Sequence, residues 1–245
     1  MKRTLIAATM LAIPSMLAAQ SGTASVTGLN ATYLAGGNTY SIAPGCAIGG
    51  CSTPGGIAPI AITLNAGFNR ILTFSVVDGT MTFCGGATCG TPNPDGPAAT
   101  LPTTNLTPSG KISGISAGTS GFLAGVFLGG SLPASAPASL DFTASGLGTD
   151  FLSLTPLLGQ QFFIGNGRTS GNIVQQFFVP DAATVLYLGI ADGFGFQGNP
   201  GAYDDNVGTY RASYSITTST VPEPSTVMLV ASGLLAAAFI RRRRC

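Results

Sequence analysis

The chain has 245 residues, of which only 8% are charged, and it contains no histidine. The absence of histidine excludes Ser-His-Asp and Cys-His catalysis as well as His-ligated catalytic metals. No pair of aspartates stands in a recognisable catalytic motif, and the single glutamate is Glu223, so we do not expect an enzyme. Between residues 20 and 220, four basic residues and eight aspartates leave a net charge of −4, which argues against a nucleic-acid partner.

The N-terminal segment has the layout of a secretory signal peptide. Two basic residues precede an apolar run over 5–17, and two small alanines follow it. We predict a signal peptide over residues 1–19, cleaved after Ala19. The alternative is a transmembrane anchor, but the run is short and Pro14 interrupts it.

The exported body, residues 20–220, is long enough to form one β-sandwich with its own core. Apolar and polar residues alternate most clearly over 210–216, and no stretch of the body has a convincing helical period. Further strand candidates, each bounded by Gly, Pro, Asn or Asp, are residues 58–64, 71–77, 122–128, 160–164, 173–179 and 184–190. Residues 21–56 hold only weak candidates, and 91–108 is typical of a long loop. We predict an all-β, jelly-roll-like antiparallel β-sandwich.

Four cysteines of the body form two short pairs, Cys46 with Cys51 and Cys84 with Cys89, and Cys245 ends the tail. In an exported chain, four cysteines suggest two disulfides. Three connectivities are possible, and we favour the one with two local disulfides, each closing a small loop, over cross-pairing. A zinc site is the alternative, although the spacing is not C-x₂-C and no histidine is present.

A loop rich in oxygen ligands covers residues 192–206. Asp192, Asp204, Asp205 and Asn206 offer carboxylate and amide oxygens, which suit a Ca²⁺ ion that takes six to eight oxygen ligands. Asn, Asp and Gly are also the residues of ordinary tight turns, so the spacing alone leaves both interpretations open.

The last 25 residues combine three features in a fixed order. Pro222, Glu223 and Pro224 form a stiff junction that neither a helix nor a strand continues through. The 16 residues 225–240 carry no charge and predict a single hydrophobic helix, and Arg241 to Arg244 favour a cytoplasmic end. The alternative, a buried core helix, would leave these arginines without partners.

This tail resembles a PEP-CTERM sorting signal of bacterial envelope proteins, with Pro222, Glu223 and Pro224 as its signature. The resemblance implies export, at least transient anchoring in the membrane over 221–245, and processing by an exosortase-type protease. The protein is then expected at the cell surface or in the extracellular matrix.

The body also resembles the small galactophilic bacterial lectins of the PA-I type. The resemblance is carried by 186–190 (LYLGI), Asp192 and 199–208 (NPGAYDDNVG), and by 72–75 (LTFS) with 79–83 (GTMTF). The lectin domain is a jelly-roll sandwich in which a Ca²⁺ ion bridges protein and sugar.

The resemblance implies five calcium ligands in this chain. These are the side chains of Asp192, Asp205 and Asn206 and the backbone carbonyls of Phe83 and Ala202. Two neighbouring sugar hydroxyls would complete the shell of the cation. The middle of the chain departs from the lectin pattern, because the histidine and glutamine sugar contacts have no counterpart and Ala202 stands where the lectins have threonine. Calcium could therefore be kept while galactose is not.

Two functions follow from these patterns. The first is a calcium-dependent module that binds extracellular polysaccharide. The second is a structural protein of the envelope or matrix in which calcium only braces the loop. Phe194 and Phe196 lie between the candidate ligands, where a ring could stack on a sugar, but burial in the core is the alternative for both.

Overall fold

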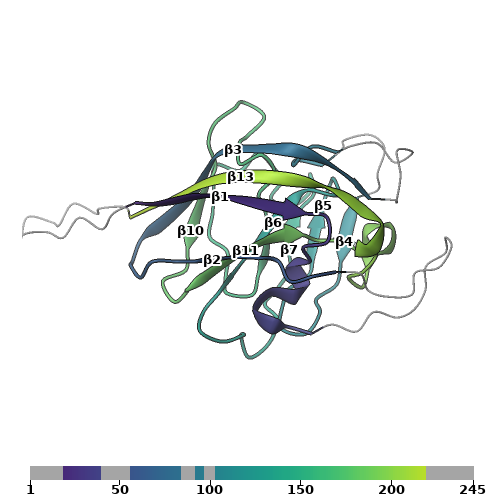
Figure 1. Ribbon diagram of the computed structural model, residues 1–245, viewed down its shortest axis with the longest axis horizontal. Helices are drawn as coiled ribbons and strands as arrows, with labels where there is room; N and C mark the ends of the chain where they lie inside the picture. Colours follow the sequence, from purple (N-terminus) through teal and green to yellow (C-terminus); the bar gives the residue numbers. More distant parts are fainter. Residues whose placement is uncertain (1–18, 40–55, 84–91, 97–102, 219–245) are drawn as a thin grey trace, which may run out of the picture.

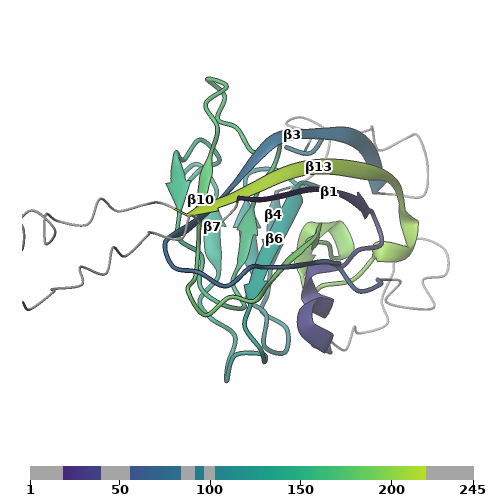
Figure 2. The ribbon, with the colours of Figure 1, turned by 60° about the vertical axis from the view of Figure 1, so that its left-hand side comes forward.

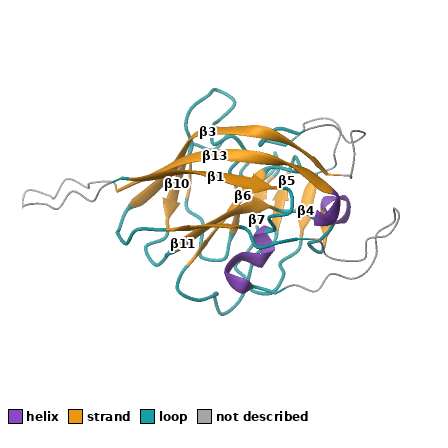
Figure 3. Ribbon diagram, in the orientation of Figure 1, coloured by secondary structure: helices purple, strands orange, loops and turns teal. Residues whose placement is uncertain are grey.

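The computed structural model describes residues 19–39, 56–83, 92–96 and 103–218. Strands dominate this part of the chain, and three short 3₁₀ helices are its helical elements (Figure 3). In chain order the elements are β1 (Gln20–Thr27), η1 (Thr32–Gly37), β2 (Ile60–Thr63), β3 (Arg70–Phe83), β4 (Thr104–Leu106), β5 (Ile115–Ala117), β6 (Leu123–Leu128), β7 (Leu140–Phe142), β8 (Ser153–Leu154), β9 (Gln161–Phe163), β10 (Gln176–Val179), β11 (Val185–Ile190), η3 (Phe194–Phe196), β12 (Gln197–Gly198), η4 (Tyr203–Asp205) and β13 (Asn206–Thr218).

The strands form three sheets, of order β1-β13-β3-β10-β8, β2-β11-β6-β9 and β12-β4-β5-β7. Figure 1 shows β3, β13 and β1 as one long curved layer above β2 and β11. Most pairs are antiparallel, but β8 pairs with β10, β12 with β4 and β7 with β5 in parallel. The all-β prediction is confirmed, whereas the sheets are not purely antiparallel.

The longest pairing joins β3 to β13. Their register runs from Asn206 opposite Phe83 at one end to Thr218 opposite Arg70 at the other. A register shift at Ser213 and Tyr214 marks a β-bulge, which bends and twists the ribbon locally. The pairing places the start of β13, and with it the end of the predicted calcium loop, beside the end of β3.

The two described ends of the chain lie next to each other. β1 is an edge strand that pairs antiparallel with β13, with Gln20 opposite Ile216 and Thr27 opposite Thr209. Figure 2 shows the two strands running side by side. The residue that follows the predicted signal peptide is therefore a neighbour of the strand that leads into the C-terminal tail.

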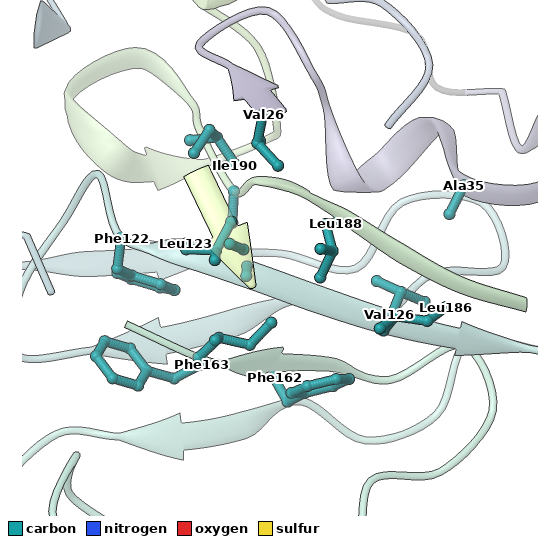
Figure 4. Packing of buried hydrophobic residues seen from close by; sticks show 14 of the residues in the cluster. Val26, Ala35, Phe122, Leu123, Val126, Phe162, Phe163, Leu186, Leu188 and Ile190 are labelled. Carbon is teal, nitrogen blue, oxygen red and sulfur yellow. The ribbon is translucent and has the colours of Figure 1, made fainter. Parts of the chain in front are cut away.

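The core is centred on β6, in which all six residues are buried. A strand buried on both faces has no polar alternation, which is why its sequence LAGVFL is apolar throughout. Figure 4 shows Leu123 and Val126 of β6 among side chains of β11 and β9. The ring of Phe127 stacks on that of Phe162 with centroids 5.0 Å apart. Each fully buried side chain of this size contributes about 1.5–3 kcal/mol to the free energy of unfolding.

One cation is buried at the start of β3. Arg70 is 2% exposed, and its guanidinium donates to four carbonyl oxygens, those of Asn65 (2.8 Å), Pro180 (2.8 Å), Asp181 (3.1 Å) and Ala183 (2.9 Å). Burial lowers the pKa of Arg70, and the charge of Asp181 opposes that shift. The side chain thus fixes the turn between β10 and β11 against the base of β3.

All seven predicted strands are present, although their bounds differ by a few residues. Residues 58–64, 71–77, 122–128, 160–164, 173–179, 184–190 and 210–216 contain or belong to β2, β3, β6, β9, β10, β11 and β13, respectively. The weak segment 21–56 contains all of β1 except Gln20, and the predicted loop 91–108 contains β4. The loop prediction is therefore wrong over Thr104–Leu106.

Several predictions fall outside the described residues. They concern the signal peptide over 1–18, all five cysteines and the hydrophobic helix over 225–240. Within the described ranges, no helix has the length and apolar character needed to cross a membrane.

Candidate functional site

The predicted calcium loop begins directly after β11. Its backbone folds back on itself, because the amide of Gly201 donates to the carbonyl of Asp192 at 2.9 Å and Gly193 bridges to Pro200. Phe194 and Phe196 of η3 lie inside this closed segment. The closure brings the residues that follow Pro200 back to the end of β11.

Asp192 carries a buried carboxylate and is 2% exposed. Its Oδ1 accepts a hydrogen bond from the amide of Gly193 at 2.7 Å, and its Oδ2 accepts one from Nδ2 of Asn206 at 2.7 Å. Desolvation raises the pKa of Asp192 well above its ordinary value, although both hydrogen bonds oppose the shift. The charges of Asp205 and Asp204 raise this pKa further.

The amide of Asn206 joins the loop to the first strand. Its Nδ2 donates to Asp192 and also to the carbonyl of Gly28 at 3.0 Å. Both partners are hydrogen-bond acceptors. The NH₂ group of the amide, and not its oxygen, must therefore face them, and this sets the orientation of the side chain. Its Oδ1 is then left buried without a hydrogen-bond partner, in a residue that is 5% exposed.

Gly28 allows this contact because it has no side chain. A Cβ at position 28 would lie 2.5 Å from Cβ of Asn206, which is closer than real Cβ contacts. The glycine follows β1, in a segment where the sequence pattern gives no signal of a site. Its role is visible only once β1 and β13 are paired.

The side chain of Tyr203 connects loop 192–206 to the end of β11. The residue is fully buried, and its hydroxyl donates to the carbonyl of Ile190 at 3.0 Å while accepting from the amide of Asp192 at 3.1 Å. Ala202, just before it, has a left-handed backbone with φ of 60° and ψ of 27°. This turn directs the chain from the loop into η4.

Phe83 lies opposite Asn206 in the register of β3 and β13 and is 7% exposed. Its ring meets that of Phe196 edge to face, with centroids 5.6 Å apart. Phe196 is 4% exposed, so burial is the correct interpretation for this ring, whereas Phe194 is 51% exposed.

The fold therefore gathers the predicted ligands at one end of β13. Asp192 forms a hydrogen bond with Asn206, Phe83 lies opposite Asn206, Ala202 precedes η4 and Asp205 is the last residue of η4. Burial, followed by the charge of Asp204, raises the pKa of Asp205. Among the described residues, no three His, Cys, Asp or Glu side chains form a metal-binding group. Any cation here would depend on the amide and carbonyl oxygens as well as on the carboxylates.

Comparison with protein families matches residues 220–244 to the PEP-CTERM protein-sorting motif. This confirms the sorting signal predicted from Pro222, Glu223 and Pro224. The motif indicates export, membrane-associated sorting to the cell surface and processing by exosortase-type machinery. Comparisons with curated proteins and with solved structures give no match, so the lectin resemblance of the body stays a prediction.

Proposed function

We propose that the exported body binds one Ca²⁺ ion at the end of β13 and uses it to bind extracellular carbohydrate at the cell surface or in the matrix. The ligands would be the side chains of Asp192, Asp205 and Asn206 and the carbonyls of Phe83 and Ala202. In this proposal the lectin-like jelly roll is the binding module, and the sorting motif directs the protein to the cell surface.

The observation that carries the proposal is that the buried carboxylate of Asp192 has no neighbouring cation and the buried Oδ1 of Asn206 has no hydrogen-bond donor among the described residues. A buried carboxylate without a cation is costly, and so is a buried amide oxygen without a donor. Both belong to residues joined by a 2.7 Å hydrogen bond. A hard divalent cation satisfies both at once, since carboxylate and amide oxygens are the ligands that Ca²⁺ prefers.

Carbohydrate binding is supported by what surrounds the buried pair. Ala202 and Asp205 are half-buried and Asp204 is exposed, so the edge of the cluster reaches solvent. A calcium ion at such an edge keeps water ligands, which two adjacent sugar hydroxyls can replace with little change in geometry. This part of the proposal rests on the lectin resemblance.

A second candidate function is a structural one, in which calcium only braces the loop. The deep burial of Asp192 and Asn206 favours it, because a cation held mainly by these two side chains would have little surface left for a sugar. The protein would then be a matrix component stabilised by calcium. Both functions require the same cation site.

The test uses the exported protein after removal of calcium with a chelator. Saturating Ca²⁺ at about 100 times its Kd should add about 2.7 kcal/mol to the free energy of unfolding. Glycan binding on an array that needs Ca²⁺ would support the lectin function, whereas stabilisation without glycan binding would support bracing. Asp192→Asn should abolish the response to calcium, and Asp78→Asn, at an exposed position on β3, is the matched control. If Ca²⁺ does not change the free energy of unfolding of the wild-type protein, the proposed calcium site is disproved.

A further inference from the structure

A second concave site lies apart from the calcium ligands and shares no residue with them. It is a pocket of about 700 Å³ bounded by the end of β7, the segment that follows it, and residues 166–170. Asp95, Gly118 and Phe163 complete its wall. A cavity of this volume is large enough for a small ligand such as a sugar residue.

Asp95 presents a half-buried carboxylate to this pocket. Its Oδ1 accepts a hydrogen bond from the amide of Asn166 at 2.7 Å, and its Oδ2 has no donor among the described residues. Desolvation raises the pKa of Asp95, while the bond from Asn166 opposes the shift. One carboxylate oxygen is therefore held in place by the backbone and the other remains available to a ligand.

Asp150 occupies another part of the wall and is fixed in a similar way. Its Oδ1 accepts from the amide of Ser170 at 2.6 Å and its Oδ2 from the hydroxyl of Ser170 at 2.5 Å. Arg168 also lines the pocket, but its guanidinium donates to the carbonyls of Asn172 and Ser75, both at 3.2 Å. The segment 166–170 thus positions both carboxylates, and neither of them forms an ion pair with Arg168 in the described structure.

The apolar part of the wall includes three aromatic rings beside Ala144 and Leu147. Phe142, Phe151 and Phe163 line the pocket, and the ring of Phe142 lies 5.7 Å from that of Phe151 and 5.9 Å from that of Phe163. Phe142 and Phe163 are buried, whereas Phe151 is half-buried. The exposed part of that ring offers an apolar face beside the fixed polar groups.

We propose that this pocket binds a neutral sugar residue of an extracellular polysaccharide without calcium. Sugar hydroxyls would donate to the open oxygen of Asp95 and to Asp150, and the apolar face of the ring would pack on Phe151. Two carboxylates against one arginine that is already engaged disfavour acidic sugars. This inference extends the carbohydrate part of the proposed function but does not depend on the cation at β13.

Gly118 offers a way to fill the site. It lines the pocket, is exposed, and a Cβ built on it meets nothing within 4 Å. Gly118→Leu should therefore obstruct the pocket while leaving the fold intact. Gly130, also exposed, has the same open surroundings and does not line the pocket, so Gly130→Leu is the matched control.

The experiment probes the exported protein, in a chelator, on an array of neutral, acidic and amino-sugar oligosaccharides, and titrates the best neutral oligosaccharide by calorimetry. Neutral glycans should bind without calcium. Asp95→Asn and Gly118→Leu should each weaken binding by about tenfold or more, the loss expected for one hydrogen bond to a charged group. Gly130→Leu should bind like the wild type.

The inference is overturned if no neutral glycan binds in the chelator, if amino sugars alone bind, or if Asp95→Asn and Gly118→Leu both leave the affinity unchanged. Thermal melting of each variant separates lost binding from lost folding, and Asp95→Asn decides the matter if Gly118→Leu does not fold. Failure of the proposed calcium site would give a different result. Adding Ca²⁺ would then leave the melting temperature unchanged, while glycans would still bind in the chelator.

Discussion

Asp192 and Asn206 are 14 positions apart in the sequence and share a 2.7 Å hydrogen bond between Oδ2 and Nδ2. Asp192 lies two positions after the end of β11, and Asn206 is the first residue of β13. The bond therefore connects the β2-β11-β6-β9 sheet to the β1-β13-β3-β10-β8 sheet. Both side chains are buried, so the energetics of this pair should dominate the response of the protein to pH, to calcium and to substitution nearby.

The pH dependence of stability should carry the signature of Asp192. Its pKa is raised in the folded protein, so the folded state binds the proton more tightly than the unfolded chain does. In a chelator, the stabilisation is fully present below the unfolded pKa of about 3.9 and is lost as pH rises through the folded pKa. Thermal melts from pH 3 upward, compared between wild type and Asp192→Asn, should show this loss only in the wild type.

The comparison with Asp192→Asn is needed because other carboxylates also titrate. Burial raises the pKa of Asp95 and of Asp205, whereas hydrogen bonds lower those of Asp141 and Asp150. The contributions of Asp95, Asp141 and Asp150 are common to both proteins and cancel in the difference, whereas Asp205 interacts with the charge of Asp192 and is part of the measured effect. A difference that does not change with pH would show that Asp192 titrates normally.

Gly28→Ala should destabilise the protein and abolish its response to calcium. The added Cβ would lie 2.5 Å from Cβ of Asn206, so the strand end or the amide must move. Overpacking of this kind costs about 1–3 kcal/mol in urea unfolding. Gly130→Ala, where the new methyl group meets open space, is the control. Equal midpoints for the two variants would contradict the close packing of β1 against Asn206.

Tyr203→Phe should leave the buried amide of Asp192 without a partner and remove one of two donors to the carbonyl of Ile190, which keeps the hydroxyl of Thr32. Each unmet group costs about 1–3 kcal/mol, so the unfolding free energy should fall clearly. The control is Tyr187→Phe, at a half-buried tyrosine whose hydroxyl forms no hydrogen bond in the described residues. If both variants melt at the same temperature, the hydroxyl of Tyr203 does not support the loop.

Arg70→Met should unfold at a lower urea concentration than the wild type. The substitution keeps an apolar stem but removes the guanidinium donors to four carbonyls, of which, among the described residues, only that of Pro180 keeps another donor, the amide of Ala183. A loss of about 3 kcal/mol is expected, and Arg70→Lys should recover little of it because an ammonium cannot reproduce the planar fork. Full recovery by lysine would show that the charge, and not the geometry, matters.

The strands that the sequence predicts show either an alternating pattern or a short apolar run such as that around β9. The alternation over 210–216 survives in β13, and the apolar run of β6 reflects burial on both faces. β1 lacks such a signal because QSGTASVT is a largely polar edge strand whose partner lies at the other end of the chain. The two-residue strands β8 and β12 are too short for any periodicity to identify.

The candidate site was accessible to sequence reasoning only in part. Oxygen-rich side chains mark Asp192 and Asn206, but no local pattern indicates that Asn206 would leave an oxygen unmet. That feature arises from Gly28, which supplies a carbonyl from 178 positions away. The pocket at Asp95 is equally non-local, because Asn166 fixes its carboxylate across 71 positions.

The pairing of β1 with β13 also sets where the candidate calcium ligands lie relative to the sorting motif. Gln20 and Ile216 meet at one end of this pairing, and Ile216 precedes the start of the sorting motif at residue 220 by four positions. The candidate calcium ligands lie at the opposite end of β13, where Asn206 is 10 residues from Ile216, and a strand of that length spans about 33 Å. In the anchored chain, the candidate ligands would thus lie at the end of β13 that is farther along the strand from the sorting motif.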